Sequence, residues 1–299
     1  MHRAGGKPGA GLRESVHGLA WISPWLAGFI AFLLVPILLS FYYSLNDYSL
    51  LESPVFIGLE NYRELTRDPL AARAVLNTVQ YAIFSVAGTT LLSIAIAILL
   101  ETPLRAAGLV RAIVFAPALV PIIASCMSWL WLFNNELGLI NAALRLVHLP
   151  APDWLGSTEL AMPSLIIMSF WVIGSPVIIY SAALKDVPAA LYEAADLDGV
   201  STWGRFRHVT LPMISPAVLF NMVMSVIWSL QVFAPPLVMT KGGPANSTLV
   251  YSVYVYMNAF LYGRMGYACA MAWVQVIATL LLTGVLLFLA RRLVYARSA

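Results

Sequence analysis

Few side chains in this sequence are placed for catalysis. Histidines and cysteines are frequent metal ligands and nucleophile or base partners, and here they are scattered: His2, His17, His148, His208, Cys126 and Cys269. Both cysteines lie inside apolar runs, where small buried side chains are common. Their spacing is typical of neither a disulfide framework nor a metal site. We therefore expect no catalytic residue and no metal site, and we do not expect an enzyme.

Six polar or aromatic residues inside apolar runs are candidates for contact with a substrate. They are Asn221, Ser225, Trp228, Ser229, Gln231 and Gln275. The first three recur at i, i+4 and i+7, which places them on one face of a helix. Amide and hydroxyl groups beside an aromatic ring suit a polyhydroxylated sugar, so we expect a substrate pathway here. Hydrogen bonding between membrane helices is the competing interpretation, because it uses the same side chains.

The second candidate site is the polar connection over residues 185–216. Pro188 suits the first turn of a helix, Gly199 can adopt the left-handed conformation that ends one, and Ser201 can cap the next. We expect two short helices joined by a sharp turn at the membrane face. Alanines give the first helix a smooth surface for close packing, and Glu193 places one charge on it.

The chain segments that hold these candidate residues are too apolar to form a domain that folds in water. Hydrophobic residues make up 61% of the chain, charged residues only 10%, and the mean hydropathy is +0.83, whereas a soluble domain is about a quarter charged. Charge-free windows cover residues 15–46, 74–100, 112–135, 160–184, 208–240 and 265–290. Each reaches the ~20 residues that a helix needs to cross ~30 Å of hydrocarbon. We therefore expect an all-α integral membrane protein with six transmembrane helices, a lipid bilayer around it and no nucleic-acid partner.

A seventh charge-free window, residues 242–263, is less suited to spanning. It opens with a Gly-Gly-Pro turn and leaves ~13 apolar residues, too few to cross the bilayer. We expect an external loop followed by an interfacial helix that carries Tyr251, Tyr254 and Tyr256.

Prolines interrupt several of the six windows, at Pro24, Pro36, Pro117, Pro121, Pro176, Pro235 and Pro236. They could be tolerated kinks between packed helices. They could also mark broken backbone that lines a solvated pathway, as in many transporters. The sequence leaves both interpretations open.

Basic residues near the span ends predict the orientation. With the N-terminus inside, the cytoplasmic side holds 11 of them: Arg3, Lys7, Arg13, Arg105, Arg111, Lys185, Arg205, Arg207, Arg291, Arg292 and Arg297. The outside holds 6: Arg63, Arg67, Arg73, Arg145, Lys241 and Arg264. We expect both termini in the cytoplasm. The first apolar run is too long for a signal peptide, so we expect it to be a retained anchor.

The expected division of the chain follows from these spans. It comprises a cytoplasmic tail (1–17), a first anchor helix (18–44), an extracytoplasmic loop (45–73), a five-helix core (74–295) that includes the connection 185–216, and a cytoplasmic tail (296–299).

The connection 185–216 resembles a known motif. Its run Glu193-Ala194-Ala195, then two residues, then Asp198-Gly199, ending in Val209-Thr210-Leu211-Pro212, is similar to the EAA loop of permease subunits of bacterial ABC importers. Other segments resemble the carbohydrate-uptake branch, of the maltose and glycerol-phosphate permease type. These are residues 56–62, Leu76-Asn77-Thr78, Asp153-Trp154-Leu155, Gly242-Gly243-Pro244 with Ser247-Thr248, and Gly266-Tyr267-Ala268. The resemblance covers residues 20 to 290.

The resemblance implies a type I ABC-importer permease in the bacterial cytoplasmic membrane. It implies a heterodimer with a second, homologous permease, two copies of an ABC ATPase and an extracytoplasmic solute-binding protein. No cofactor is expected on this chain, which lacks a G-x-x-x-x-G-K-[ST] loop; ATP and Mg²⁺ would bind the ATPase. The residues implied in coupling to it are Glu193, Ala194, Ala195, Asp198, Gly199, Leu211 and Pro212. Four aromatic or apolar neighbours could pack on the ATPase or on the parent spans: Leu191, Tyr192, Trp203 and Phe206.

The sequence leaves alternatives open for the transported substrate and for the functional class of the protein. Sugar or oligosaccharide import by alternating access is the leading interpretation. The same machinery could carry a phosphorylated polyol such as a glycerol phosphate, or another small polar solute, although no Lys or Arg lies inside a span. A self-sufficient channel would leave the EAA loop without a purpose.

Overall fold

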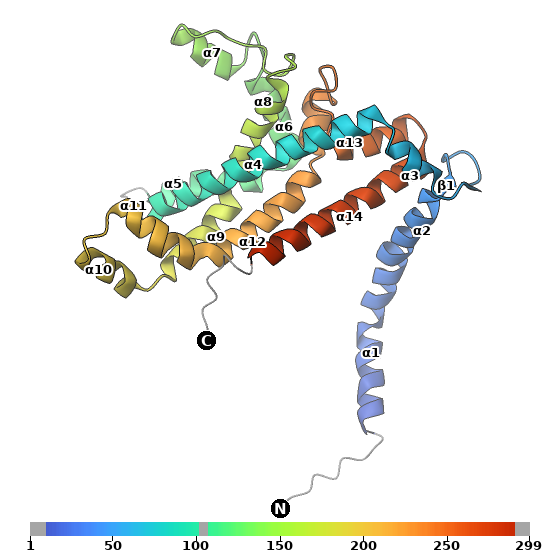
Figure 1. Ribbon diagram of the computed structural model, residues 1–299, viewed down its shortest axis with the longest axis horizontal. Coiled ribbons are helices and arrows are strands. Elements are labelled where there is room, and N and C mark those ends of the chain that lie inside the picture. Colours follow the sequence, from blue (N-terminus) through green and yellow to red (C-terminus); the bar gives the residue numbers. More distant parts are fainter. Residues whose placement is uncertain (1–9, 102–106, 291–299) are drawn as a thin grey trace, which may run out of the picture. The chain divides into compact units, whose positions relative to one another are not determined.

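The computed structural model of the protein describes residues 10–101 and 107–290, and these are mostly helical (Figure 1). Six basic residues used to predict the orientation lie outside this described part, as does the predicted boundary after residue 295: Arg3, Lys7, Arg105, Arg291, Arg292 and Arg297. The chain divides into two compact units. The first comprises residues 1–65 and 258–273, and the second comprises residues 66–257 and 274–299.

The first unit begins with one long helix. It consists of α1 (Ala10–Phe29), a π turn (Ile30–Leu34) and α2 (Val35–Ser44). It starts within the segment 1–17 that was expected to be a tail. Pro36 lies two residues after the end of the π turn, whose wider backbone accommodates its missing N–H. Residues Ala20–Ser44 are long and apolar enough to span a membrane, and none of their most apolar window is buried.

A hydrogen-bonded loop follows this helix in the first unit. Two short antiparallel strands, β1 (Asn46–Asp47) and β2 (Val55–Phe56), lead to α3 (Glu60–Leu65). The buried Asn61 donates from Nδ2 to the carbonyl oxygens of Ser44 and Asn46, at 3.0 and 2.9 Å. Gly266, in the first turn of α14 (Met265–Ala290), donates its N–H to Tyr48 at 3.0 Å. A Cβ at Gly266 would collide with the carbonyl of Asn46, so only glycine permits this approach.

Three helices form the core of the second unit: α4 (Pro69–Glu101), α9 (Gly174–Lys185) and α12 (Leu211–Leu230). Each packs against the other two, side by side in Figure 1. Their small and apolar residues permit close packing, and a buried cluster lies between α4 and α9: Ile94, Ala97, Leu100, Ile173, Val177 and Tyr180.

Two of the apolar windows are bent helix pairs rather than straight spans. α5 (Ala107–Phe115) continues through a 3₁₀ turn (Ala116–Leu119) and meets α6 (Ile122–Leu132) at 106°. Pro121 is the cause, because it lacks an N–H and forces Val120 out of the helical region, to φ −83° and ψ 129°. Likewise α8 (Ala161–Ser169), with its 3₁₀ end (Phe170–Val172), meets α9 at 49°.

The number of spans agrees with the six charge-free windows when each bent pair is counted as one span. The described residues hold four straight helices that are long and apolar enough to cross a membrane: Ala20–Ser44, Pro69–Glu101, Thr202–Leu230 and Met265–Ala290. The two bent pairs bring the total to six.

The connection after α9 differs from the expected pair of short helices. α10 (Ala189–Leu197) is short, but α11 (Thr202–Arg205) continues through a π turn (Phe206–Thr210) into α12 as one helix from Thr202 to Leu230. The expectation of a second separate helix was wrong, because nothing between the Ser201 cap and Pro212 breaks the helix. The π turn, which ends two residues before Pro212, accommodates the missing donor of this proline.

The seventh window folds onto the protein. A π turn (Pro236–Thr240) and a tight loop lead to α13 (Tyr251–Tyr256), which is followed by a further π turn (Met257–Leu261). α13 packs on α4, and Tyr251 and Tyr254 are buried rather than exposed as an interfacial helix would have them. Thr78 accepts the N–H of Tyr251 at 2.8 Å, and Asp68 accepts the hydroxyl of Tyr254 at 2.7 Å. Burial, and secondarily Asp68, raises the pKa of the Tyr251 phenol, so it stays protonated.

Candidate functional site: a coupling loop and a central cavity

The connection over residues 185–216, called the coupling loop below, contains α10 and α11. The turn between these two helices has the left-handed backbone conformation that was predicted for its glycine. Gly199 has φ +69°, its N–H bonds to Asp196 at 3.1 Å, and the N–H of Val200 bonds to Ala195 at 3.0 Å. This pair of bonds is a Schellman motif, which closes the last turn of a helix. Ser201 then caps α11 by accepting the N–H of Gly204 at 3.2 Å. The prediction of a left-handed Gly199 and a Ser201 cap is confirmed.

Two side-chain contacts fasten α10 to the helix that follows. Arg205 pairs with Asp196 at 2.5 Å, and the hydroxyls of Tyr192 and Thr210 lie 3.0 Å apart. Phe206 packs against the core cluster between α4 and α9. Tyr192 and Phe206 therefore contact the parent helices, which is one of the two interpretations left open for them. The ion pair and the hydroxyl pair were not anticipated from the sequence.

The outer surface of this loop combines exposed acids with exposed apolar groups. Glu193, Ala194, Asp198 and Gly199 are exposed, whereas Ala195 is buried. Leu211 and Pro212 are half-buried at the start of α12.

The loop also presents Leu197 and Trp203, which are 90% and 67% exposed. Leu191 is 40% exposed. Apolar side chains this exposed at the end of a bundle form a surface suited to a protein partner. Figure 1 shows α10 and α13 at opposite ends of α4, so this surface lies far from the outer loops of the second unit.

A cavity of about 700 Å³ opens among α4, α8, α9 and α12. Five of the six predicted pathway residues line it: Asn221, Ser225, Trp228, Ser229 and Gln231. Asn221 and Ser229 are buried, whereas Trp228 is 69% exposed and forms part of the open wall. The helical spacing of Asn221, Ser225 and Trp228 therefore does place them on a common face.

Gln275 lies elsewhere. Its Nε2 donates to the carbonyl of Leu230 at 2.9 Å and to the Ser252 hydroxyl at 3.0 Å, and Gln275 is absent from the cavity lining. Its role in the structure is to hold α14 to α12 and α13. This is the hydrogen bonding between helices that was the competing interpretation for the whole set.

The other walls of the cavity come from α4 and from the helix breaks. Tyr81, Ser85 and Thr89 recur along one face of α4 and supply hydroxyl groups. Ser175 and Pro176 follow the 49° bend, and the segment 231–235 beyond α12 completes the lining. The prolines at these two breaks therefore border a cavity as well as kinking helices. The α4 hydroxyls were not predictable from the sequence, because which face of α4 meets α12 depends on the packing.

The described residues that line this cavity carry no charge. None of its lining residues is Asp, Glu, Lys, Arg or His. The polar groups available are hydroxyls, the amides of Asn221 and Gln231, and the indole of Trp228. Asn221 donates to the carbonyl of Ala217 at 3.0 Å, which leaves its amide oxygen able to accept a bond from a ligand. The arrangement can bind and orient a neutral polar molecule, and it offers no nucleophile–base pair.

Comparison with known proteins decides the family. The pattern of the binding-protein-dependent transport system inner membrane components matches residues 93–297. The chain belongs to this family. The permease is accordingly a multi-pass membrane translocation component of an ABC transporter and not an enzyme.

Curated relatives match this permease over most of their length. It is 34% identical over 279 residues to the probable ABC transporter permease protein YesP of Bacillus subtilis, covering 92% of this chain and 90% of YesP. It is 31% identical to the trehalose/maltose transport system permease protein MalF of Thermococcus litoralis (93% and 95% covered). It is 32% identical to the lactose transport system permease protein LacF of Rhizobium radiobacter (92% and 94% covered).

A solved structure shows the fold. A chain of a bacterial ABC transporter involved in the import of the acidic polysaccharide alginate superimposes with a TM-score of 0.83 at 22% identity, covering 95% of this permease and 98% of that chain. The fold is that of a type I ABC-importer permease.

The segments that resembled the carbohydrate branch are structural anchors of the loops. Asn77 donates to the carbonyls of Asn246 and Leu249 at 2.8 and 2.9 Å. Trp154 donates to the buried Asn141 at 2.8 Å, which fixes the loop around α7 (Leu139–Leu146). Such side chains hold the loops in place through hydrogen bonds, and they do not line the central cavity.

Proposed function

We propose that this permease translocates an uncharged sugar or oligosaccharide into the cytoplasm by alternating access, driven by a separate ABC ATPase. The cavity of about 700 Å³ supports this substrate class, because its described lining offers hydroxyl, amide and indole groups and no charge. Amides and hydroxyls match the donors and acceptors of a polyol, and an aromatic face covers the apolar face of a sugar ring.

The names of the relatives support this class. MalF of Thermococcus litoralis and LacF of Rhizobium radiobacter are named for trehalose/maltose and lactose, which are neutral disaccharides. A phosphorylated polyol is the alternative. Its phosphate would need a cation or several oriented donors in a dry site, and the cavity wall from this chain provides no cation.

The assembly we propose follows the family. A second, homologous permease completes the pathway beside the exposed Trp228. Two ATPase subunits bind ATP and Mg²⁺, and one of them docks on the coupling loop of this permease. An extracytoplasmic binding protein delivers the solute. The bacterial cytoplasmic membrane is the location, with both termini and the coupling loop on the cytoplasmic side. Glu193 and the exposed Leu197 and Trp203 support docking at this loop.

Uptake into proteoliposomes tests the substrate class. The complete complex, with its binding protein, is offered radiolabelled maltose, trehalose, lactose and glycerol 3-phosphate. We expect ATP-dependent uptake of a neutral saccharide. Uptake of glycerol 3-phosphate without any saccharide would establish the alternative.

A pair of tryptophan variants tests the cavity. Trp228→Ala removes the aromatic wall and should lower uptake at low substrate about fivefold to tenfold, the equivalent of ~1 kcal/mol of aromatic contact. Trp131→Ala removes a tryptophan of similar exposure that lies outside the cavity and is the matched control. Equal effects of the two substitutions, or none from Trp228→Ala, would contradict the proposed pathway.

A further inference from the structure

A second hollow, of about 480 Å³, lies between α4, α5 and α9, at the end of the bundle nearest the coupling loop. Its inner part is apolar and includes Leu100, Val114, Phe115 and Val177, whereas the exposed Ile178 lies at its edge. Its mouth carries Arg111 and Lys185, with side chains 47% and 57% exposed. The hollow thus has an apolar interior and a cationic rim.

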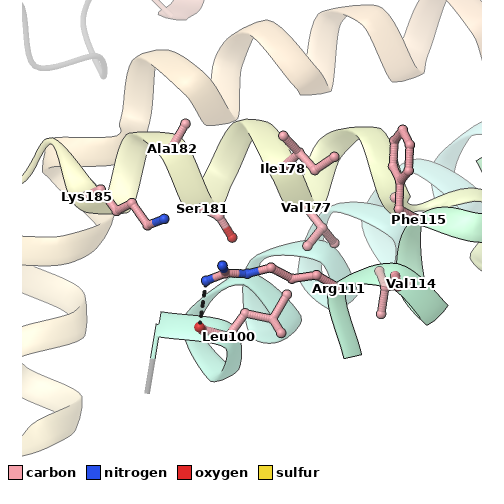
Figure 2. A pocket seen from close by; sticks show the side chains of 11 residues that line it. Leu100, Arg111, Val114, Phe115, Val177, Ile178, Ser181, Ala182 and Lys185 are labelled. Atoms are coloured by element: carbon pink, nitrogen blue, oxygen red, sulfur yellow. Dashed lines mark hydrogen bonds between the residues drawn. The ribbon is translucent and has the colours of Figure 1, made fainter. Parts of the chain in front are cut away.

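The charges at the mouth are held in place by one carboxylate. Glu101 Oε1 lies 3.6 Å from Arg111 Nη2 and 3.9 Å from Lys185 Nζ. Two cations and one carboxylate leave one net positive charge. Arg111 also donates to the carbonyl of Leu100 at 3.2 Å, which fixes the guanidinium beside the hollow (Figure 2). A guanidinium has five donors, so donors remain for an anion.

An unpaired hydroxyl faces the same place. Ser181 lines the hollow, its oxygen is fully buried, and it has no hydrogen-bond partner among the described residues. Figure 2 shows Ser181 and Val177 pointing from α9 toward Arg111. A buried hydroxyl without a partner costs free energy unless a ligand or water satisfies it.

The sequence places this mouth at the edge of the hydrocarbon layer. Glu101, Arg111 and Lys185 each directly adjoin a charge-free window, namely residues 74–100, 112–135 and 160–184. The cations therefore lie at headgroup level, and the apolar part of the hollow extends from them into the acyl region. Lys185 leads into the coupling loop, so the headgroup level is that of the cytoplasmic leaflet in the orientation proposed above.

We propose that this hollow is a binding site for one anionic phospholipid of the inner leaflet. The phosphate lies between Arg111 and Lys185 and accepts a hydrogen bond from Ser181, and an acyl chain fills the apolar interior. Because the site joins the ends of α4, α5 and α9 directly before the coupling loop, the bound lipid braces the helices from which that loop departs. The opposite charges of the rim and the phosphate favour an anionic over a zwitterionic headgroup.

Native mass spectrometry of the full-length chain, alone and in its assembled complex, tests the site. Dioleoyl phosphatidylglycerol and dioleoyl phosphatidylcholine, which have identical acyl chains, are titrated separately. We expect one tightly bound phosphatidylglycerol per permease, which phosphatidylcholine does not replace. Each basic side chain near an anionic headgroup is worth about a fivefold change in affinity, so Arg111→Gln with Lys185→Gln should weaken phosphatidylglycerol binding on the order of tenfold or more.

Two further variants distinguish a built site from general attraction. Arg67→Gln with Arg73→Gln removes the same charge from exposed positions at the other end of α4 and should leave phosphatidylglycerol binding unchanged. Ser181→Phe removes the buried hydroxyl and places a large side chain beside Arg111 (Figure 2) without changing charge, so it should abolish the tightly bound lipid. Equal loss in the Arg67/Arg73 control, or full binding in Ser181→Phe, would overturn the proposal. So would a site in the isolated chain that is closed in the complex, because the second permease would then be its occupant.

Discussion

Substitution of Gly199 tests whether the backbone shape of the coupling loop controls docking of the ATPase, without preventing insertion of the permease into the membrane. Gly199 has φ +69°, and a Cβ built there meets nothing within 4 Å. Alanine at this position therefore suffers no collision and only the cost of the left-handed conformation, about 1–2 kcal/mol. That free energy shifts the balance between the native turn and a frayed one about 5-fold to 30-fold. Two hydrogen bonds of the turn, to Ala195 and Asp196, are lost in the frayed form.

The assay is capture of the ATPase by the permease, together with substrate-stimulated ATP hydrolysis by the assembled complex. We expect Gly199→Ala to weaken both by fivefold or more while the protein inserts in normal amounts. Gly199→Asn should lie between alanine and the wild type, because asparagine tolerates the left-handed region better. Gly284→Ala in α14, where a Cβ also meets open space and φ is helical, is the matched control and should have no effect.

The reasoning fails in either of two ways. If Gly199→Ala captures the ATPase as well as the wild type, the shape of this turn does not control docking. If Gly199→Asn is as defective as Gly199→Ala, the defect arises from side-chain bulk at the interface rather than from backbone conformation.

Three further predictions concern the stability of the permease and of its coupling loop. Asn77→Leu removes the side-chain donor from the carbonyls of Asn246 and Leu249. The buried Leu249 carbonyl loses this donor, at about 1–3 kcal/mol, whereas the Asn246 carbonyl still accepts the N–H of Leu249. The variant should lower the midpoint of thermal unfolding in detergent and expose the loop 241–250 to protease; an unchanged cleavage pattern would contradict this anchor. Gly174→Ala places a Cβ 2.9 Å from the backbone of Phe115, so it should destabilise the permease by about 1–3 kcal/mol. An unaltered unfolding midpoint would show that α5 and α9 can move apart without loss of stability. Arg205→Ala breaks a partly exposed ion pair with Asp196 that is worth at most about 1 kcal/mol. ATPase capture should therefore fall less than in the glycine variant; a larger fall would mean that the arginine contacts the partner itself.

Local chemistry determined the most reliable predictions from the sequence. The six spans follow from runs of uncharged residues, because each charge inside the bilayer costs several kcal/mol and sets a boundary. The turn at Gly199 and the cap at Ser201 were predictable because both depend on a residue's own backbone preference or on a partner a few positions away. The common face of Asn221, Ser225 and Trp228 follows from helix geometry alone.

Packing decided the rest. No local signal showed that Gln275 bonds between helices while Gln231 faces the cavity, since both are amides in apolar surroundings and only the neighbouring helices distinguish them. Burial of Tyr251 and Tyr254 depends on Thr78 and Asp68, more than 170 positions away in the chain. The meeting of Glu101, Arg111 and Lys185 around one hollow has the same origin. The sequence placed each at a membrane boundary, and the contact of α4, α5 and α9 brought them together.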